Sequence, residues 1–102
     1  MNNNKSQLIK KSIAKIDISK IANYQQEYPQ SKTLRQIIRY SKRIWDSNNE
    51  EEIFKLSVEL AYLLDVICDP DKGGYVKEEK EKKYLLKISN ELFRNTIGAK
   101  EK

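Results

Sequence analysis

The chain has 102 residues and a formal net charge of +5, with 38% hydrophobic and 34% charged residues. This length suits one domain, residues 1–102, with a single modest core. Three glycines and two prolines are too few for a turn-rich all-β protein, and one cysteine without any histidine excludes an internal disulfide and a Cys–His catalytic pair.

The positive charge is concentrated in the first half of the chain. Residues 1–46 carry ten Lys and Arg against three acids, a balance of +7, whereas residues 47–102 carry ten against twelve, a balance of −2. A basic half can attract nucleic acid or the anionic inner surface of a membrane, but it is more commonly a solvated surface.

The N-terminal third predicts one short helix followed by a connector. Residues 1–4 are expected to form a flexible end without the apolar core of a signal peptide. The helix after them has a narrow apolar stripe of isoleucines: Ile9, Ile13 and Ile16. Residues 17–32 are predicted to be a connector that allows a helical turn or two from Ser19 through Tyr24, and Pro29 forces a break at Tyr28 or before.

Residues 34–45 predict a cleanly amphipathic helix. Thr33 and Gln36 match a capping box at its start. Its apolar side is Leu34, Ile37, Ile38, Ser41, Ile44 and Trp45. Its opposite side is a candidate basic face of Arg35, Arg39, Lys42 and Arg43. Four interpretations of this face stay open: it binds nucleic acid, anionic lipid or an acidic protein surface, or it contacts only solvent.

The run from residue 50 to residue 67 predicts the central helix, with Asn49 and Glu52 as a second capping arrangement. Its main stripe is Ile53, Leu56, Leu60, Leu63, Leu64 and Ile67, and a flank of Phe54, Val58 and Ala61 widens it. A helix apolar over so much of its circumference must be covered from more than one side. It therefore requires several partner helices.

Pro70 and the Gly73–Gly74 pair end the central helix, and a last helix is predicted from residue 76 or 77 to residue 94 or 95. Residues 96–102 are expected to be a flexible end. The last helix has a candidate partner-binding edge, which is Lys87, Phe93, Arg94 and Ile97. The alternative is that the first helix or the connector covers its apolar members.

These elements predict an all-α protein, an antiparallel four-helix bundle. Cys68 at a helix end is more typical of buried packing than of a nucleophile. Asp69 and Asp71 are spaced like the first ligands of a calcium loop, but Gly73 and Lys80 stand where further ligands are needed. The sequence therefore predicts no enzyme activity, no metal and no cofactor, and no membrane-spanning run, as in a cytoplasmic protein.

Four pieces of the chain resemble, in helix order and hydrophobic spacing, the immunity proteins of pediocin-like (class IIa) bacteriocins, the enterocin A immunity family. The pieces are KIDISK, TLRQIIRYSKRIW, EEEIFKLSVELAYLL and KEEKEKKYLLKISNELFR. The resemblance implies a cytoplasmic, non-enzymatic four-helix bundle that protects a bacterial cell from a pore-forming antimicrobial peptide. It also implies a partner, the mannose phosphotransferase permease with bound bacteriocin, recognised at the inner face of the membrane.

The same resemblance places specificity in the C-terminal half, at Lys87, Phe93, Arg94 and Ile97. Contact with the membrane surface is compatible with it, and no nucleic acid is expected as a partner. The alternative from another class is a small helical nucleic-acid-binding or regulatory protein that uses the basic face of residues 34–45. The acidic first turn of the following helix, residues 50–52, would repel phosphate and argues against that alternative.

Overall fold

The computed structural model describes residues 3–97, which form five α-helices and one short 3₁₀ helix. They are α1 (Asn3–Ala14), α2 (Ile18–Glu27), α3 (Lys32–Asp46), α4 (Glu50–Cys68), η1 (Pro70–Lys72) and α5 (Glu79–Arg94). No strand occurs among these residues, so the described part of the chain is all-α. None of its helices is both long enough and apolar enough to cross a membrane.

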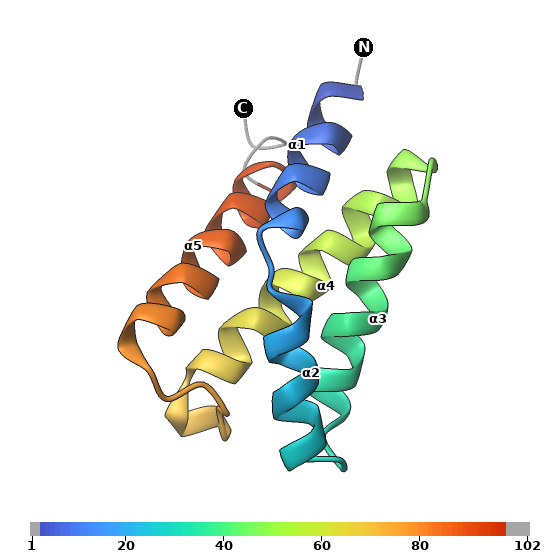
Figure 1. Cartoon of the computed structure of the whole chain (residues 1–102). Helices are drawn as coiled ribbons and strands as arrows, with labels where there is room; N and C mark the ends of the chain where they lie inside the picture. The colour runs from blue at the N-terminus through green and yellow to red at the C-terminus, as the bar shows by residue number, and fades with distance from the viewer. Residues whose placement is uncertain (1–2, 98–102) are drawn as a thin grey trace.

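The central helix is α4, as the sequence predicts. It packs most extensively against α5 and α3, while α1 lies against α4, α5 and α3. Figure 1 shows α4 behind α1 and α2, with α3 on one side and α5 on the other. This arrangement covers the wide apolar surface of α4 from several directions, which is what its sequence requires.

The core lies along this central helix. Leu60, Leu64 and Ile67 are completely buried, and so is Ala61, which the sequence placed on the flank. The hydroxyl of Ser89 on α5 donates a 2.8 Å hydrogen bond to the carbonyl oxygen of Ala61. Two small buried residues therefore allow the backbones of α4 and α5 to approach closely, and the serine hydroxyl remains satisfied inside the core.

The predicted connector over residues 17–32 is wrong for most of its length, because residues 18–27 form the ten-residue helix α2. Asp17 is its N-cap and accepts a hydrogen bond from the backbone N–H of Lys20. The predicted break at Tyr28 is confirmed: its φ of −125° and ψ of 68° are not helical, as expected before Pro29. The described chain thus has five α-helices instead of four.

Two of the predicted caps have different outcomes. The Asn49 cap is confirmed, since its side chain accepts a 3.1 Å hydrogen bond from the N–H of Glu52. The Thr33 cap is wrong, because Ser31 is the N-cap of α3 and accepts a 3.2 Å hydrogen bond from the N–H of Leu34. Both Ser31 and Thr33 are suitable residue types, and only the path of the chain after Pro29 selects between them.

The predicted start of the last helix, at residue 76 or 77, is three or two residues too early. The N–H groups of Tyr75 and Val76 both donate to the carbonyl oxygen of Ile67, at 2.9 and 3.1 Å. Val76 is buried at this point, and α5 begins only at Glu79. The residues after the turn at Gly73, whose φ is +76°, are therefore held against the end of α4.

Trp45, which the helical pattern places on the apolar side of residues 34–45, lies instead on the surface, and so does Tyr84 of α5. Trp45 is 54% exposed, and Tyr84 is 48% exposed with its hydroxyl donating to the carbonyl oxygen of Lys15. A one-face helical pattern does not distinguish the middle of the buried stripe from its edge, and large amphipathic rings tolerate the edge.

Parts of the two predicted flexible ends fall within the described residues. Asn3 and Asn4 belong to α1, and Thr96 is buried, with its hydroxyl donating 2.7 Å to the carbonyl oxygen of Leu92. The fold thus includes positions at both ends that the sequence assigned to flexible segments. Residues 1–2 and 98–102 lie outside the described residues.

Candidate recognition surfaces

The predicted edge of α5 is divided between two sides of the helix. Phe93 is half-buried on the side of α4, and Ile97, 39% exposed, follows it one helical turn later. Lys87 and Arg94 are both exposed and, being seven residues apart, lie on the same side of α5, turned away from the core. The four residues therefore form an apolar pair and a basic pair, and not one continuous patch.

The apolar member Phe93 is already engaged with α4. Its ring packs edge-to-face on Tyr62, with 5.1 Å between ring centroids and 81° between ring planes. Tyr62 is itself 57% exposed, so the pair is visible from solvent. The sequence suggested the first helix or the connector as the cover of Phe93, whereas the ring that packs on it belongs to α4.

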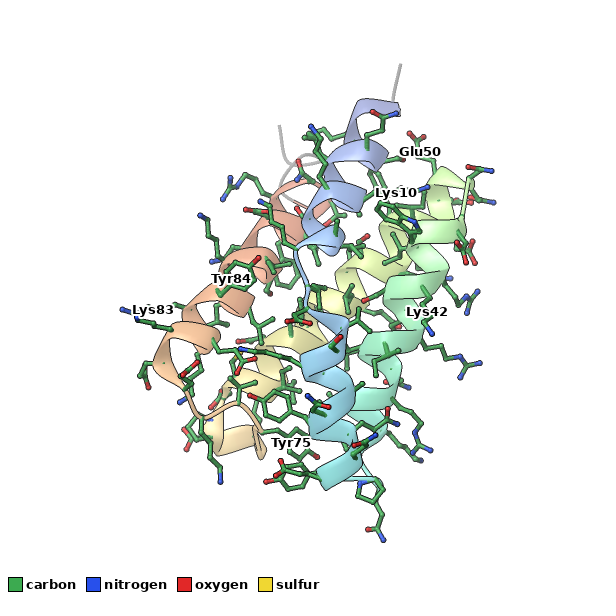
Figure 2. All side chains as sticks on the ribbon, viewed as in Figure 1. Lys10, Lys42, Glu50, Tyr75, Lys83 and Tyr84 are labelled. Carbon is green, nitrogen blue, oxygen red and sulfur yellow. The ribbon has the colours of Figure 1, made fainter. Side chains whose placement is uncertain are left out.

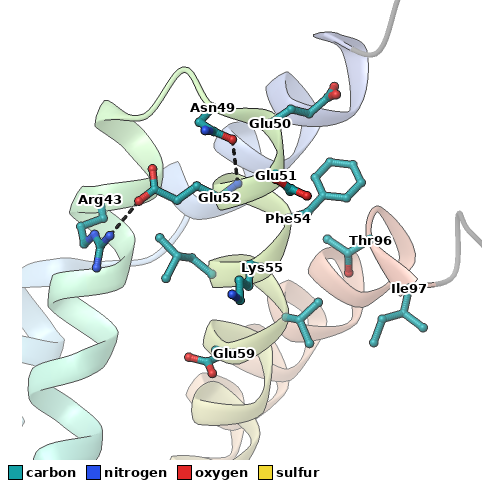
Figure 3. Close-up of a pocket in the computed structure, with 12 residues that line it drawn as sticks. Arg43, Asn49, Glu50, Glu51, Glu52, Phe54, Lys55, Glu59, Thr96 and Ile97 are labelled. Carbon is teal, nitrogen blue, oxygen red and sulfur yellow. Dashed lines mark hydrogen bonds and ion pairs between the residues drawn. The ribbon is translucent and has the colours of Figure 1, made fainter.

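A groove runs beside this pair, between the first half of α4 and the end of α5 (Figure 3). It has a volume of about 1090 Å³. Its apolar lining includes Phe54, Val58 and Ile97, and Figure 3 shows Phe54 on the side of α4 that faces Thr96 and Ile97. Sequence reasoning placed Phe54 and Val58 in the core, whereas both are only half-buried. Their i, i+4 spacing on the flank of α4 was the signal for a second apolar surface.

The charges at the rim of the groove are mostly acidic. Glu50, Glu51 and Glu59 line it, together with the ion pair between Arg43 and Glu52, whose atoms Nη2 and Oε2 are 2.7 Å apart (Figure 3). The hydroxyl of Ser47 also donates to Glu52, at 2.7 Å. The hydrogen bond from Ser47 has the larger effect and that from Arg43 the next, and both lower the pKa of the Glu52 carboxyl below its ordinary value. Arg43 is thereby directed toward α4 and separated from the rest of the predicted basic face.

The remaining three residues of the basic face form an exposed row on α3. Arg35, Arg39 and Lys42 follow one another at intervals of four and three residues, and all three are exposed. Within residues 3–97 their side chains make no hydrogen bond or ion pair with the protein. The end of this row lies one turn from the exposed Trp45. None of these three residues lines the groove, so the basic row and the groove are distinct surfaces.

The single cysteine has the properties of a packing residue. Cys68 is 4% exposed at the end of α4, and burial raises the pKa of its thiol to about 11. A thiol that is protonated at neutral pH and shielded from solvent is a poor nucleophile. Among the described residues, no three side chains of Asp, Glu, Cys or His are grouped as metal ligands.

Polar contacts connect the N-terminal helices to α5. The Ser12 hydroxyl donates 2.7 Å to Glu91, and the Lys15 ammonium lies 3.2 Å from the same carboxylate, so together they lower the pKa of the Glu91 carboxyl. The hydroxyl of Tyr24 on α2 donates a hydrogen bond to Glu81. Burial is the larger cause, and this hydrogen bond the second, of a raised pKa of the Tyr24 phenol. Such contacts hold α1 and α2 in register with α5.

These surfaces are defined only by this chain's own residues. No protein-family model, no curated protein and no solved structure matches the chain. A functional conclusion therefore depends on the helix pattern and on the two surfaces described above.

Proposed function

We propose that this chain is a bacteriocin immunity protein, a non-enzymatic binding protein that protects a bacterial cell from a pore-forming antimicrobial peptide. In this proposal it recognises the membrane receptor, the mannose phosphotransferase permease with bound bacteriocin, from the cytoplasmic side. The observation that supports it best is the groove between α4 and the end of α5, where Phe54, Val58 and the exposed Ile97 are accompanied by charges. The half-buried Phe93 lies one helical turn before Ile97. Such a combination of an apolar floor and a charged rim suits protein recognition.

The proposal includes the bundle architecture. We infer that α1 and α2 act as the two halves of one bent first helix, so that the chain forms an antiparallel four-helix bundle. Only three residues, 15–17, separate the two helices, and Figure 1 shows α2 continuing in nearly the direction of α1. In the same view α3, α4 and α5 alternate in direction after them.

The direct test is protection of a living cell. The chain is expressed in a strain sensitive to pediocin-like bacteriocins, and survival is measured against a panel of these peptides. We expect raised survival for at least one peptide. Unchanged killing across the whole panel, with the protein present in soluble extract, would reject the proposal.

Variants locate the recognition surface. Arg94→Glu reverses an exposed charge, so we expect it to reduce protection while helical content stays unchanged. Lys83→Glu is the matched control, because Lys83 is also exposed and lies three turns earlier near the same side of α5. Phe93→Ala is expected to reduce protection as well, but its packing on Tyr62 makes it the less clean variant. Full protection by both Arg94→Glu and Phe93→Ala would remove the end of α5 from the proposal.

A further inference from the structure

The surface around Trp45 has no role in the groove described above. Trp45 is the single tryptophan of the chain, and it is 54% exposed at the end of α3. A large amphipathic ring so far out of the core prefers an environment that is apolar on one side and wet on the other. The boundary between lipid headgroups and acyl chains provides both.

A shallow apolar groove lies directly beside this ring. It has a volume of about 270 Å³ and runs between the junction of α1 with α2 and the last turns of α3. Ile13, Ala14, Ile16 and Ile18 line it together with Trp45, and its polar lining is Ser41, Lys42 and Asp46. The groove is thus mostly aliphatic, with little to hydrogen-bond a polar ligand.

The charges around the groove are mainly positive. Lys42 lies on its edge, and the exposed row continues along α3 to Arg39 and Arg35. On α1, the Lys10 ammonium donates a 2.9 Å hydrogen bond to the carbonyl oxygen of Ser47. This bond holds the cation beside the end of α3. Figure 2 shows Lys10 and Lys42 on neighbouring parts of α1 and α3. Asp46 is the single acid in the lining of the groove.

We propose that this surface, the Trp45 surface, binds the anionic headgroups of a lipid bilayer, with the Trp45 ring inserted at the interface and Arg35, Arg39 and Lys42 over the headgroups. The basic residues supply charge complementarity to anionic lipid, to which each Lys or Arg near the surface adds attraction. Nucleic acid is the other polyanion with this charge, but an aliphatic groove beside the indole gives bases no hydrogen-bonding partners and suits acyl chains better.

This inference deepens the proposed function, on which it rests for its biological setting, since a protein that acts on a membrane receptor from within works next to the inner leaflet. Its test uses only purified protein and lipid. Lipid binding without protection would therefore reject the proposed function alone, and protection without lipid binding would reject the present inference alone.

The experiment uses Trp45 as its own reporter, because no other tryptophan contributes to the emission. The purified chain is titrated with vesicles of phosphatidylcholine alone and with vesicles containing phosphatidylglycerol. We expect a blue shift of roughly 10 nm with the anionic vesicles and none with the neutral ones, as the ring leaves water. Addition of salt to about 0.5 M should reverse the shift, because it screens the headgroup charge. An absent shift at low salt, or an equal shift with neutral vesicles, would overturn the proposal.

Vesicle sedimentation of matched variants tests the named residues. Arg35→Glu combined with Arg39→Glu should weaken binding by roughly tenfold or more. The control, Lys80→Glu combined with Lys83→Glu, makes the same charge change on α5 at two exposed positions and should leave binding within about twofold of the wild type. Trp45→Ala should lose most of the binding, whereas Tyr62→Ala, which removes a similarly exposed ring from α4, should not. Equal losses in variant and control would overturn the proposal.

A final arm distinguishes lipid from nucleic acid. Single-stranded and duplex DNA and RNA are added to the protein at the same low salt, alone and in competition with the anionic vesicles. We expect neither a shift of the Trp45 emission nor displacement of the vesicles. Displacement by nucleic acid at lower concentrations than anionic lipid would overturn the lipid proposal in favour of a nucleic-acid surface.

Discussion

The groove at the end of α5 and the Trp45 surface use aromatic side chains differently. Next to the groove, Phe93 is half-buried against Tyr62, and the rim of the groove carries the acids of the first turns of α4. On the Trp45 surface, the ring is more than half exposed, its neighbours in the groove are mostly aliphatic, and the exposed basic row of α3 begins at the edge with Lys42. A packed ring contributes to the fold and to recognition together, whereas an exposed ring can be removed with little effect on folding. The two surfaces should therefore respond differently to the same kind of truncation.

The largest expected difference is in the free energy of unfolding of the two aromatic truncations. Phe93→Ala should lower it by about 1–2 kcal/mol, because the variant loses packing and an edge-to-face aromatic pair. Trp45→Ala should lower it by less than about 0.5 kcal/mol, as for other exposed positions. Urea denaturation followed by far-UV circular dichroism measures both variants without a need for tryptophan emission. Equal losses would contradict the distinction between the two surfaces.

A smaller effect is expected at the start of α4, which forms one rim of the groove. Asn49→Ala removes the side-chain acceptor for the N–H of Glu52 and should lower the free energy of unfolding by about 1 kcal/mol. Asn48→Ala changes the adjacent exposed asparagine, which is not the N-cap, and should stay within about 0.5 kcal/mol of the wild type. Thermal denaturation of the two variants measures the difference, and identical midpoints would show that the Asn49 cap does not contribute to stability.

The smallest effect concerns Glu91, which joins the end of α1 to α5, and this effect depends on pH. The pKa of this carboxyl lies below its ordinary value of 4.5, because the Ser12 hydroxyl and the Lys15 ammonium favour the carboxylate. The unfolded chain therefore binds this proton at higher pH than the folded chain does. The stability that the contact contributes is complete at neutral pH, and it is lost as the pH falls from about 4.5 through the lower folded-state pKa.

The variant Glu91→Gln isolates this contribution. The neutral amide lacks the proton linkage, so its unfolding free energy should fall less steeply than that of the wild type below pH 4.5. The measurement is urea denaturation at a series of pH values between neutral and acid. Parallel curves for the two proteins over the acid range would contradict the assignment of the Glu91 contact.

Much of the helical core was predictable from local pattern. The stripe through Leu60, Leu64 and Ile67 is buried as expected, and the Asn49 cap starts α4 where the sequence placed it. Both depend on spacing and residue type within one helical turn or two. The burial of Cys68 follows from the same pattern, because its helix is apolar to the end.

The candidate surfaces were only partly predictable. The exposure of Arg35, Arg39 and Lys42 follows from the helical period, but the diversion of Arg43 to Glu52 requires the turn at Ser47 that brings α3 and α4 together. The same holds for Phe54, which the sequence assigned to the core. Its place in a groove results from how far α5 extends along α4.

The sequence by itself determined that the described chain is helical, where its wide apolar helix runs and which residues of α3 carry charge outward. These properties depend on periodicity, capping and backbone stereochemistry, which act over a few residues. The tertiary structure decided that residues 18–27 are helical, that Trp45 is exposed and that Thr96 is buried. Each of these depends on which helices lie next to the residue. The local sequence pattern does not determine how much of a residue a neighbouring helix covers.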